Sequence, residues 1–183
     1  MEKNLEKRMY FFTIYQLTGI QCGIQCGHAA LEYAAKYGTT KEFDDFIKNW
    51  KTWIILNGGT TNNQRELGTG KPLGSLNDIA DQLLENKIAF THFEEPDLNN
   101  ALTALCFICD ERVFNKEDYP DFINYLIDIS NKNISAQEII QLRMMPYEEL
   151  IRTYGYHYEK WINFVGGAEN IFLRELLKDK EKA

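Results

Sequence analysis

The sequence predicts an α/β fold, with three α/β/α layers around a mixed sheet of about four strands, plus C-terminal helices. Up to residue 110, strand-like and helix-like segments alternate in the order βααβαββ, whose long connections place helices over a sheet. After Asp110 only helix-like segments follow. With 183 residues, 44% of them hydrophobic, the chain is long enough for one ordinary core.

The expected elements of the first part are defined by residue type and spacing. Strands follow from aromatic and β-branched runs, and helices from apolar residues three and four positions apart. In chain order we expect a strand at 9–17, helices at 22–37 and 43–50, a strand at 53–56, a loop or an irregular hairpin at 60–74, a helix at 75–86, and strands at 88–93 and 102–109. Ser75 with Asp78 resembles a capping box that opens the third helix.

In the last third of the chain the residue pattern predicts only helices, at 119–130, 135–144, 146–164 and 168–180. Ser135 followed by Glu138 is a capping box, and Pro146 suits a first helical position. We therefore divide the chain into an α/β domain at 1–132 and a helical extension at 133–183.

Aromatic side chains recur at helical spacing within 147–164, which predicts that they pack in a core. Aromatic rings also stack on nucleobases, so a second interpretation is that they hold a small nucleotide. For the extension as a whole, three roles stay open: it caps the pocket, forms a homodimer interface, or does neither.

The charge balance limits the kind of partner. The net charge is −7, and no lysine or arginine stripe is visible, so a nucleic-acid contact over many phosphates is not expected. Any such contact would be small and local. No apolar run approaches the roughly 18 to 20 residues that span a bilayer, and the N-terminus lacks the features of a secretory signal. We expect a cytoplasmic protein with no membrane partner.

The stretch Gly19–Leu31, where the first strand meets the first helix, is the most specific motif. Small residues there leave backbone amides exposed at a helix start, which suits a phosphate or a developing oxyanion. Gln21, Gln25 and His28 are four and three positions apart and can project from one face of the helix. The alternative is that Gln25 and His28 are buried and merely hydrogen-bonded.

A second motif runs from Phe93 to Ala104, through a turn between two strands. Its carboxylates, Glu94, Glu95 and Asp97, lie within four residues, where burial or mutual repulsion could raise one pKa into a useful range. A purely structural turn built on proline and Asx residues is the competing explanation.

The four cysteines, Cys22, Cys26, Cys106 and Cys109, are expected as reduced, packed thiols rather than as a zinc site. Cys106 and Cys109 are an odd number of positions apart in a strand, so they turn to opposite faces. We expect no metal and no other cofactor.

Taken together, the two motifs resemble the type 2 peptidyl-tRNA hydrolase family over about residues 9–130, in a divergent bacterial and viral branch. The resemblance lies in Gln-Cys-Gly-His-Ala-Ala on the first helix and in Glu-Pro-Asp-Leu-Asn-Asn before Leu-Thr-Ala. It implies metal-independent hydrolysis of the ester between a peptide or amino acid and tRNA. By resemblance, Asp97 takes the place of the catalytic aspartate, and Thr103 that of a threonine at the start of the last strand.

The same resemblance places Gln25 and His28 at the motif positions of the first helix. We expect Asp97, with His28, to activate water, and Gln25 and Thr103 to supply hydrogen-bond donors. The residues expected to bind substrate are Gly19, Gln21, Asn99 and Asn100. The first helix and the acidic turn must then meet at one site.

One position departs from the family, because Gln21 stands where the best-studied members carry a lysine. The turn is also shorter than theirs. The lost cation and the acidic charge suggest a viral protein of the same fold that binds or hydrolyses a small cyclic nucleotide. A third interpretation is an inactive scaffold for a protein partner.

Overall fold

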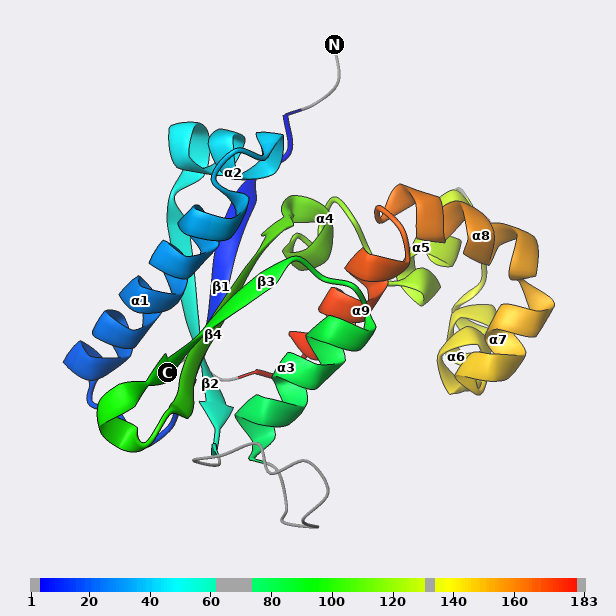
Figure 1. Cartoon of the computed structure of the whole chain (residues 1–183). Helices are drawn as coiled ribbons and strands as arrows, with labels where there is room; N and C mark the ends of the chain where they lie inside the picture. The colour runs from blue at the N-terminus through cyan, green and yellow to red at the C-terminus, as the bar shows by residue number, and fades with distance from the viewer. Residues whose placement is uncertain (1–3, 62–73, 131–133, 181–183) are drawn as a thin grey trace. The chain divides into compact units, whose positions relative to one another are not determined.

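The computed structural model describes residues 4–61, 74–130 and 134–180 (Figure 1). The chain divides into two compact units, each described by itself below. The α/β unit comprises Met1–Asp110 and Leu176–Ala183, and the helical unit comprises Glu111–Glu175. The division therefore follows the last strand, whereas the predicted one after residue 132 falls within the helical unit.

A mixed four-stranded sheet forms the centre of the α/β unit, as predicted. Its strands are β1 (Lys7–Ile14), β2 (Thr52–Gly59), β3 (Phe90–Glu95) and β4 (Ala101–Asp110). They lie in the order β2-β1-β4-β3. β1 is parallel to β2 and antiparallel to β4, and β3 is antiparallel to β4.

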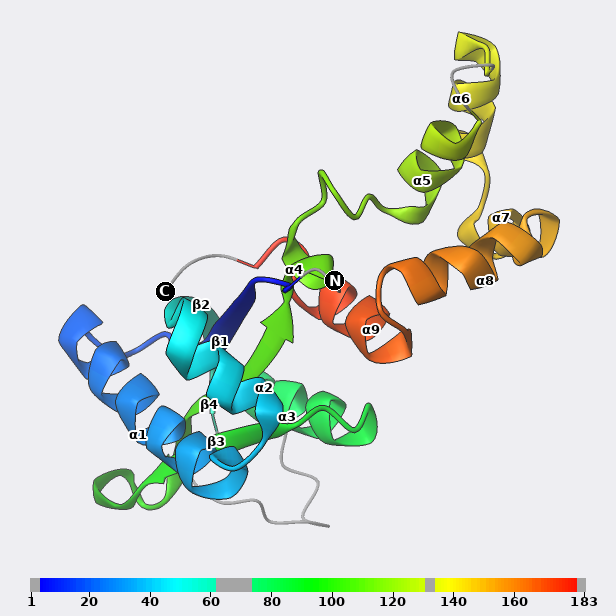
Figure 2. The same ribbon diagram turned by 90° about the horizontal axis from the view of Figure 1, so that it is seen from above.

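Helices cover both faces of this sheet, with α1 (Gly19–Tyr37) on one side and α3 (Ser75–Glu85) on the other (Figure 2). The α1 side is built from alternate strand residues and the inward face of the helix: Met9, Phe11, Cys26, Ala29, Tyr33, Ala104, Cys106 and Ile108. On the α3 side, Phe12 and Phe107 stack, and Gly58 leaves room for Leu76. Two apolar layers therefore fix the sheet between helices.

Several element boundaries differ from the expectation for local reasons. α1 begins at Gly19 because Thr18 caps it. The segment expected as one helix at 43–50 is α2 (Lys41–Asp45) followed by a π-helical turn, η1 (Phe46–Trp50), which ends at left-handed Lys51 (φ 56°).

The expected capping box at Ser75 is wrong. Gly74 is the N-cap of α3, and no side chain caps it. The Ser75 hydroxyl instead donates to Gly58 O (2.9 Å) and accepts from Thr60 N (2.9 Å), which ties the helix to the end of β2. Most of the loop expected at 60–74 lies outside the described residues.

The helical unit contains α4 (Glu111–Phe114), α5 (Phe122–Ile129), α6 (Ala136–Met144), α7 (Tyr147–Thr153) and α8 (Gly155–Phe164), and most of α9 (Ala168–Leu176). The capping box of Ser135 with Glu138 is confirmed. The single helix expected at 146–164 is wrong, because the chain breaks at Tyr154. Before α9, Gly166 and Gly167 turn the chain with φ angles of 95° and 101°.

This unit has an apolar core of its own, made of Phe122, Leu126, Leu142, Leu150, Trp161 and Val165. Tyr154 and Tyr158 pack against it, as the periodicity predicts. Buried Arg174 donates to Arg112 O (2.5 Å), Tyr119 O (2.9 Å) and Asp121 Oδ1 (2.6 Å). The guanidinium thus joins segments that are distant in sequence.

Candidate functional site

A hydrogen-bonded chain of three side chains joins α1 to the two strands β3 and β4. The Thr103 hydroxyl donates to Gln25 Oε1 (2.6 Å), and Gln25 Nε2 donates to Glu95 Oε2 (2.6 Å). Thr103 is fully buried, Gln25 is 7% exposed, and Glu95 is half-buried. The chain therefore begins in the core of the α/β unit and ends in a carboxylate near the surface.

A register shift in the β3–β4 pairing explains how Thr103 reaches Gln25. Phe93 pairs with Ala104 and Glu94 with Leu102, so Thr103 is the extra residue of a bulge. A bulge interrupts alternation and lets adjacent residues face the same side. Ala104 and Thr103 accordingly both lie on the α1 side of the sheet.

The orientation of the Gln25 amide follows from its partners. The Glu95 carboxylate, when ionised, can only accept hydrogen bonds, so the NH₂ group must face it and the carbonyl oxygen must face the Thr103 hydroxyl. The second Glu95 oxygen accepts from Asp97 N (3.5 Å). Glu95 is thus held from the helix and from its own turn.

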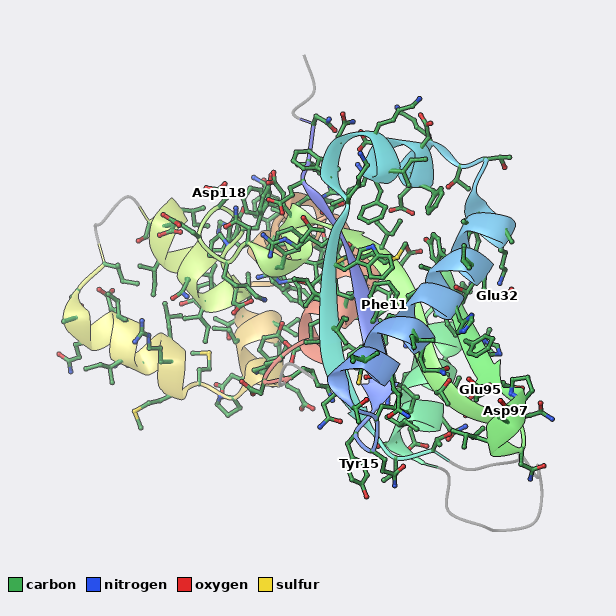
Figure 3. All side chains as sticks on the ribbon, turned by 90° about the vertical axis from the view of Figure 1, so that its left-hand side faces the viewer. Phe11, Tyr15, Glu32, Glu95, Asp97 and Asp118 are labelled. Atoms are coloured by element: carbon green, nitrogen blue, oxygen red, sulfur yellow. The ribbon has the colours of Figure 1, made fainter. Side chains whose placement is uncertain are left out.

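The acidic turn carries the remaining predicted residues of the second motif. Glu95 and Asp97 lie together at the end of β3, where the short helix η2 (Pro96–Leu98) begins (Figure 3). Asp97 is exposed, and its carboxylate has no hydrogen-bond partner in the described parts of the chain. Gln25 and Asp97 both contact Glu95, so the first helix and the acidic turn meet there, while their sharing of a substrate site stays a prediction.

Asn99 and Asn100 have a structural role in this turn. Both adopt left-handed conformations, with φ of 56° and 55°, which asparagine tolerates better than most residues. Asn100 N donates to Glu95 O (3.0 Å). The left-handed conformations and the backbone hydrogen bond account for their place in the turn, while their expected contact with substrate stays a prediction.

His28 lies beside the hydrogen-bonded chain. Its ring stacks on Phe93, with ring centroids 4.4 Å apart and an interplanar angle of 19°. Gln25 and His28 are three positions apart and lie on one face of the helix. Phe93 and Glu95 are two positions apart and lie on one side of the strand. The helix pair therefore faces the strand pair, Gln25 opposite Glu95 and His28 opposite Phe93. Unlike Gln25, His28 is exposed.

Gln21 and Gly19 lie at the exposed start of α1. The Gln21 side chain accepts from Thr18 N (2.9 Å), and Thr18 Oγ1 accepts from Gln21 N (3.3 Å). This capping box satisfies two backbone amides at the helix start. A Cβ at Gly19 would meet no atom within 4 Å, so this glycine is not required by packing.

All four cysteines are free and buried. Burial raises the pKa of Cys26 and of Cys106 to about 12, so both stay protonated near neutral pH. Cys106 Sγ donates to Ala29 O (3.3 Å) within the core. Among the residues that the structure describes, no three His, Cys, Asp or Glu side chains are grouped to hold a metal ion.

A surface hollow of about 410 Å³ lies at the end of β2 and the start of α3. Its lining includes Asn57, Gly59, Asp78 and Gln82. None of the predicted site residues lines it, so the hollow and the hydrogen-bonded chain are separate features of the α/β unit.

No protein-family model matches the chain, and no curated protein matches its sequence. In the described ranges, no helix has the length and apolar character needed to cross a membrane.

Glu95 and Phe93 belong to the predicted second motif, but neither was assigned a catalytic or binding role or a contact with the first helix. Alternation along β3 was the available signal, because it puts Phe93 and Glu95 on the same side of the sheet. The sequence did not show which side faces α1.

Proposed function

We propose that the protein is a metal-independent hydrolase that cleaves an ester on a nucleotide-linked substrate, a peptidyl- or aminoacyl-tRNA. The observation that carries the proposal is the Glu95 carboxylate, held by Gln25 at 2.6 Å and open toward the surface. The motifs that resemble type 2 peptidyl-tRNA hydrolases contain Gln25 and Thr103, and Glu95 is the glutamate of the Glu-Pro-Asp motif.

In the proposed reaction, Glu95 accepts a proton from a water molecule as the water oxygen attacks the acyl carbon. The tetrahedral intermediate then collapses, the ester C–O bond breaks, and the proton passes from Glu95 to the leaving ribose oxygen, which becomes a hydroxyl. The Gln25 amide stabilises the ionised carboxylate and fixes its orientation, which general base catalysis requires. Thr103 keeps the amide in that orientation.

This assignment makes Glu95, rather than Asp97, the group that activates water. Asp97 is exposed and contributes its backbone amide to Glu95, whereas the Glu95 side chain is held at both oxygens. A fixed carboxylate is the better general base, because orientation contributes to the rate. The role of Asp97 implied by resemblance is the competing assignment.

The test compares Glu95→Gln with Asp97→Asn on a peptidyl-tRNA and an aminoacyl-tRNA, with EDTA present. We expect Glu95→Gln to lower kcat/KM by roughly 10²- to 10⁴-fold and Asp97→Asn by less than about tenfold. The reverse order would assign the reaction to Asp97.

A wild-type protein that cleaves neither ester would refute the hydrolase proposal. Cyclic nucleotides are assayed in parallel, because their disappearance would instead support the immune-signal alternative. A thermal shift without turnover would support a binding protein. No response in any assay would favour the scaffold.

A further inference from the structure

We infer that His28 and Phe93 form a stacking platform for a nucleobase, next to the Glu95 carboxylate. The inference rests on the proposed function for the identity of the ligand, which is the nucleoside whose ribose carries the ester. It gives His28 a binding role in place of the proton transfer expected from its motif.

The geometry of the two rings supports the platform. They are nearly parallel, with centroids 4.4 Å apart, as in offset aromatic stacks. Phe93 is half-buried and packs against the α1-side core, so it forms the fixed lower layer. His28 is exposed and forms the outer layer, whose free face can take a third flat ring.

The surroundings of His28 suit a base better than a phosphate. From Gly19 to Leu31 the helix carries no charged side chain, and the first one after that, exposed Glu32, lies one turn beyond His28 and would repel a phosphate. Ile24, one turn before His28, is 52% exposed and extends the apolar surface. Stacking on aromatic rings holds bases without sequence readout, and it is compatible with a protein of net charge −7.

The imidazole also lacks the contacts of a structural histidine. Within the described residues, neither ring nitrogen of His28 has a hydrogen-bond partner, and stacking on Phe93 is the contact that orients the ring. A catalytic histidine is usually oriented by a second polar group. Here the ring presents a surface rather than a directed proton.

The spacing along β3 relates the platform to the carboxylate. Phe93 and Glu95 are two residues apart on one side of the strand, a separation of about 7 Å. A base stacked on His28 therefore brings its own ribose toward Glu95. The susceptible ester is accordingly on the ribose of the stacked nucleoside and not on a distant part of the substrate.

The test uses adenosine 5′-monophosphate as the probe and ribose 5-phosphate as the matched compound without a base. Binding to the full chain is followed through the NMR signals of the His28 ring protons. We expect the nucleotide to move these signals upfield, because a stacked ring shields them, and ribose 5-phosphate to leave them in place.

Three variants separate stacking from other roles. His28→Ala should weaken nucleotide binding by roughly 5- to 150-fold, the range typical of one lost stacking contact. His28→Phe should keep the affinity within about threefold, since a phenyl ring also stacks. His92→Ala is the control, because the exposed His92 ring is tilted by 37° against Phe90 and stacks on neither ring of the platform.

Equal responses to the two probes, or unchanged affinity in His28→Ala, would overturn the platform. A loss in His28→Phe as large as that in His28→Ala would also overturn it, because an imidazole nitrogen would then be required. Nucleotide binding at His28 without ester hydrolysis would leave the platform standing and refute the hydrolase. Ester hydrolysis with an unchanged KM in His28→Ala would support the hydrolase and overturn the platform.

Discussion

Thr103 shows how one buried hydroxyl can organise a surface carboxylate. It is fully buried, and it donates to a glutamine that itself donates to Glu95. Strict alternation along β4 would place Thr103 with Leu105 and Phe107, on the α3 side. The motif in the sequence therefore indicates Thr103 as a site residue, but it does not predict the contact of Thr103 with Gln25. That contact depends on the bulge in the pairing of β4 with β3.

We predict that Thr103→Val lowers the free energy of unfolding by about 1–3 kcal/mol. The substitution keeps the shape but leaves the buried Gln25 carbonyl oxygen without its donor. Urea unfolding at neutral pH measures the effect, and Thr103→Ser is the control because it retains the hydroxyl. Equal stability of the valine variant and the wild type would show that the hydrogen bond contributes nothing net.

At the scale of elements, local signals predicted some boundaries and missed others. The Ser135–Glu138 cap was predicted because both partners are adjacent in sequence. The cap predicted at Ser75 is wrong, because the Ser75 hydroxyl forms hydrogen bonds with Gly58 and Thr60, which are distant in sequence. Residue pattern alone does not distinguish a helix cap from a tertiary contact.

The turn between α8 and α9 gives a prediction at this scale. Gly167 has φ 101°, a conformation that side chains with a Cβ rarely adopt, although no atom lies within 4 Å of a Cβ placed there. We expect Gly167→Ala to destabilise the protein by about 1–3 kcal/mol through backbone strain alone.

Gly155, which begins α8, supplies the matched control for this turn. A Cβ there also meets no atom within 4 Å, but φ is not positive. We expect Gly155→Ala to be neutral or stabilising by up to about 1 kcal/mol. Thermal unfolding of both variants separates strain from crowding, and equal effects would contradict the strain explanation.

At the scale of the whole molecule, each of the two units has its own apolar core among the described residues, where length alone predicted one ordinary core. The residue pattern predicted the fold class and the mixed sheet. Strand-like and helix-like segments alternate up to Asp110, and only helix-like segments follow. The pattern did not give the strand order, since β1 and β4 are paired across almost the whole α/β unit. Non-local pairing of this kind leaves little trace in a single sequence.

We predict that Leu150→Ala destabilises the helical unit by about 2–5 kcal/mol, because this fully buried side chain leaves a cavity in its core. Hydrogen exchange should then speed up in α5 and α8 more than in β1 and β4. Ile140→Ala is the control, since Ile140 is 57% exposed. Equal acceleration in both units would indicate one cooperative structure.

Thr103, the extra residue in β4, contributes a hydrogen bond to the chain that reaches Glu95 without taking a place in the strand pairing with β3. The other residues of that strand up to Cys109 are apolar and buried, whereas the extra residue Thr103 carries a polar group inward. A protein with the same layers but no bulge in this strand would keep the architecture. It would lose the hydrogen bonds that connect Thr103 through Gln25 to the Glu95 carboxylate. Gain or loss of a single codon in β4 would therefore create or remove the hydrogen-bonded chain from Thr103 to Glu95 while leaving both layers in place.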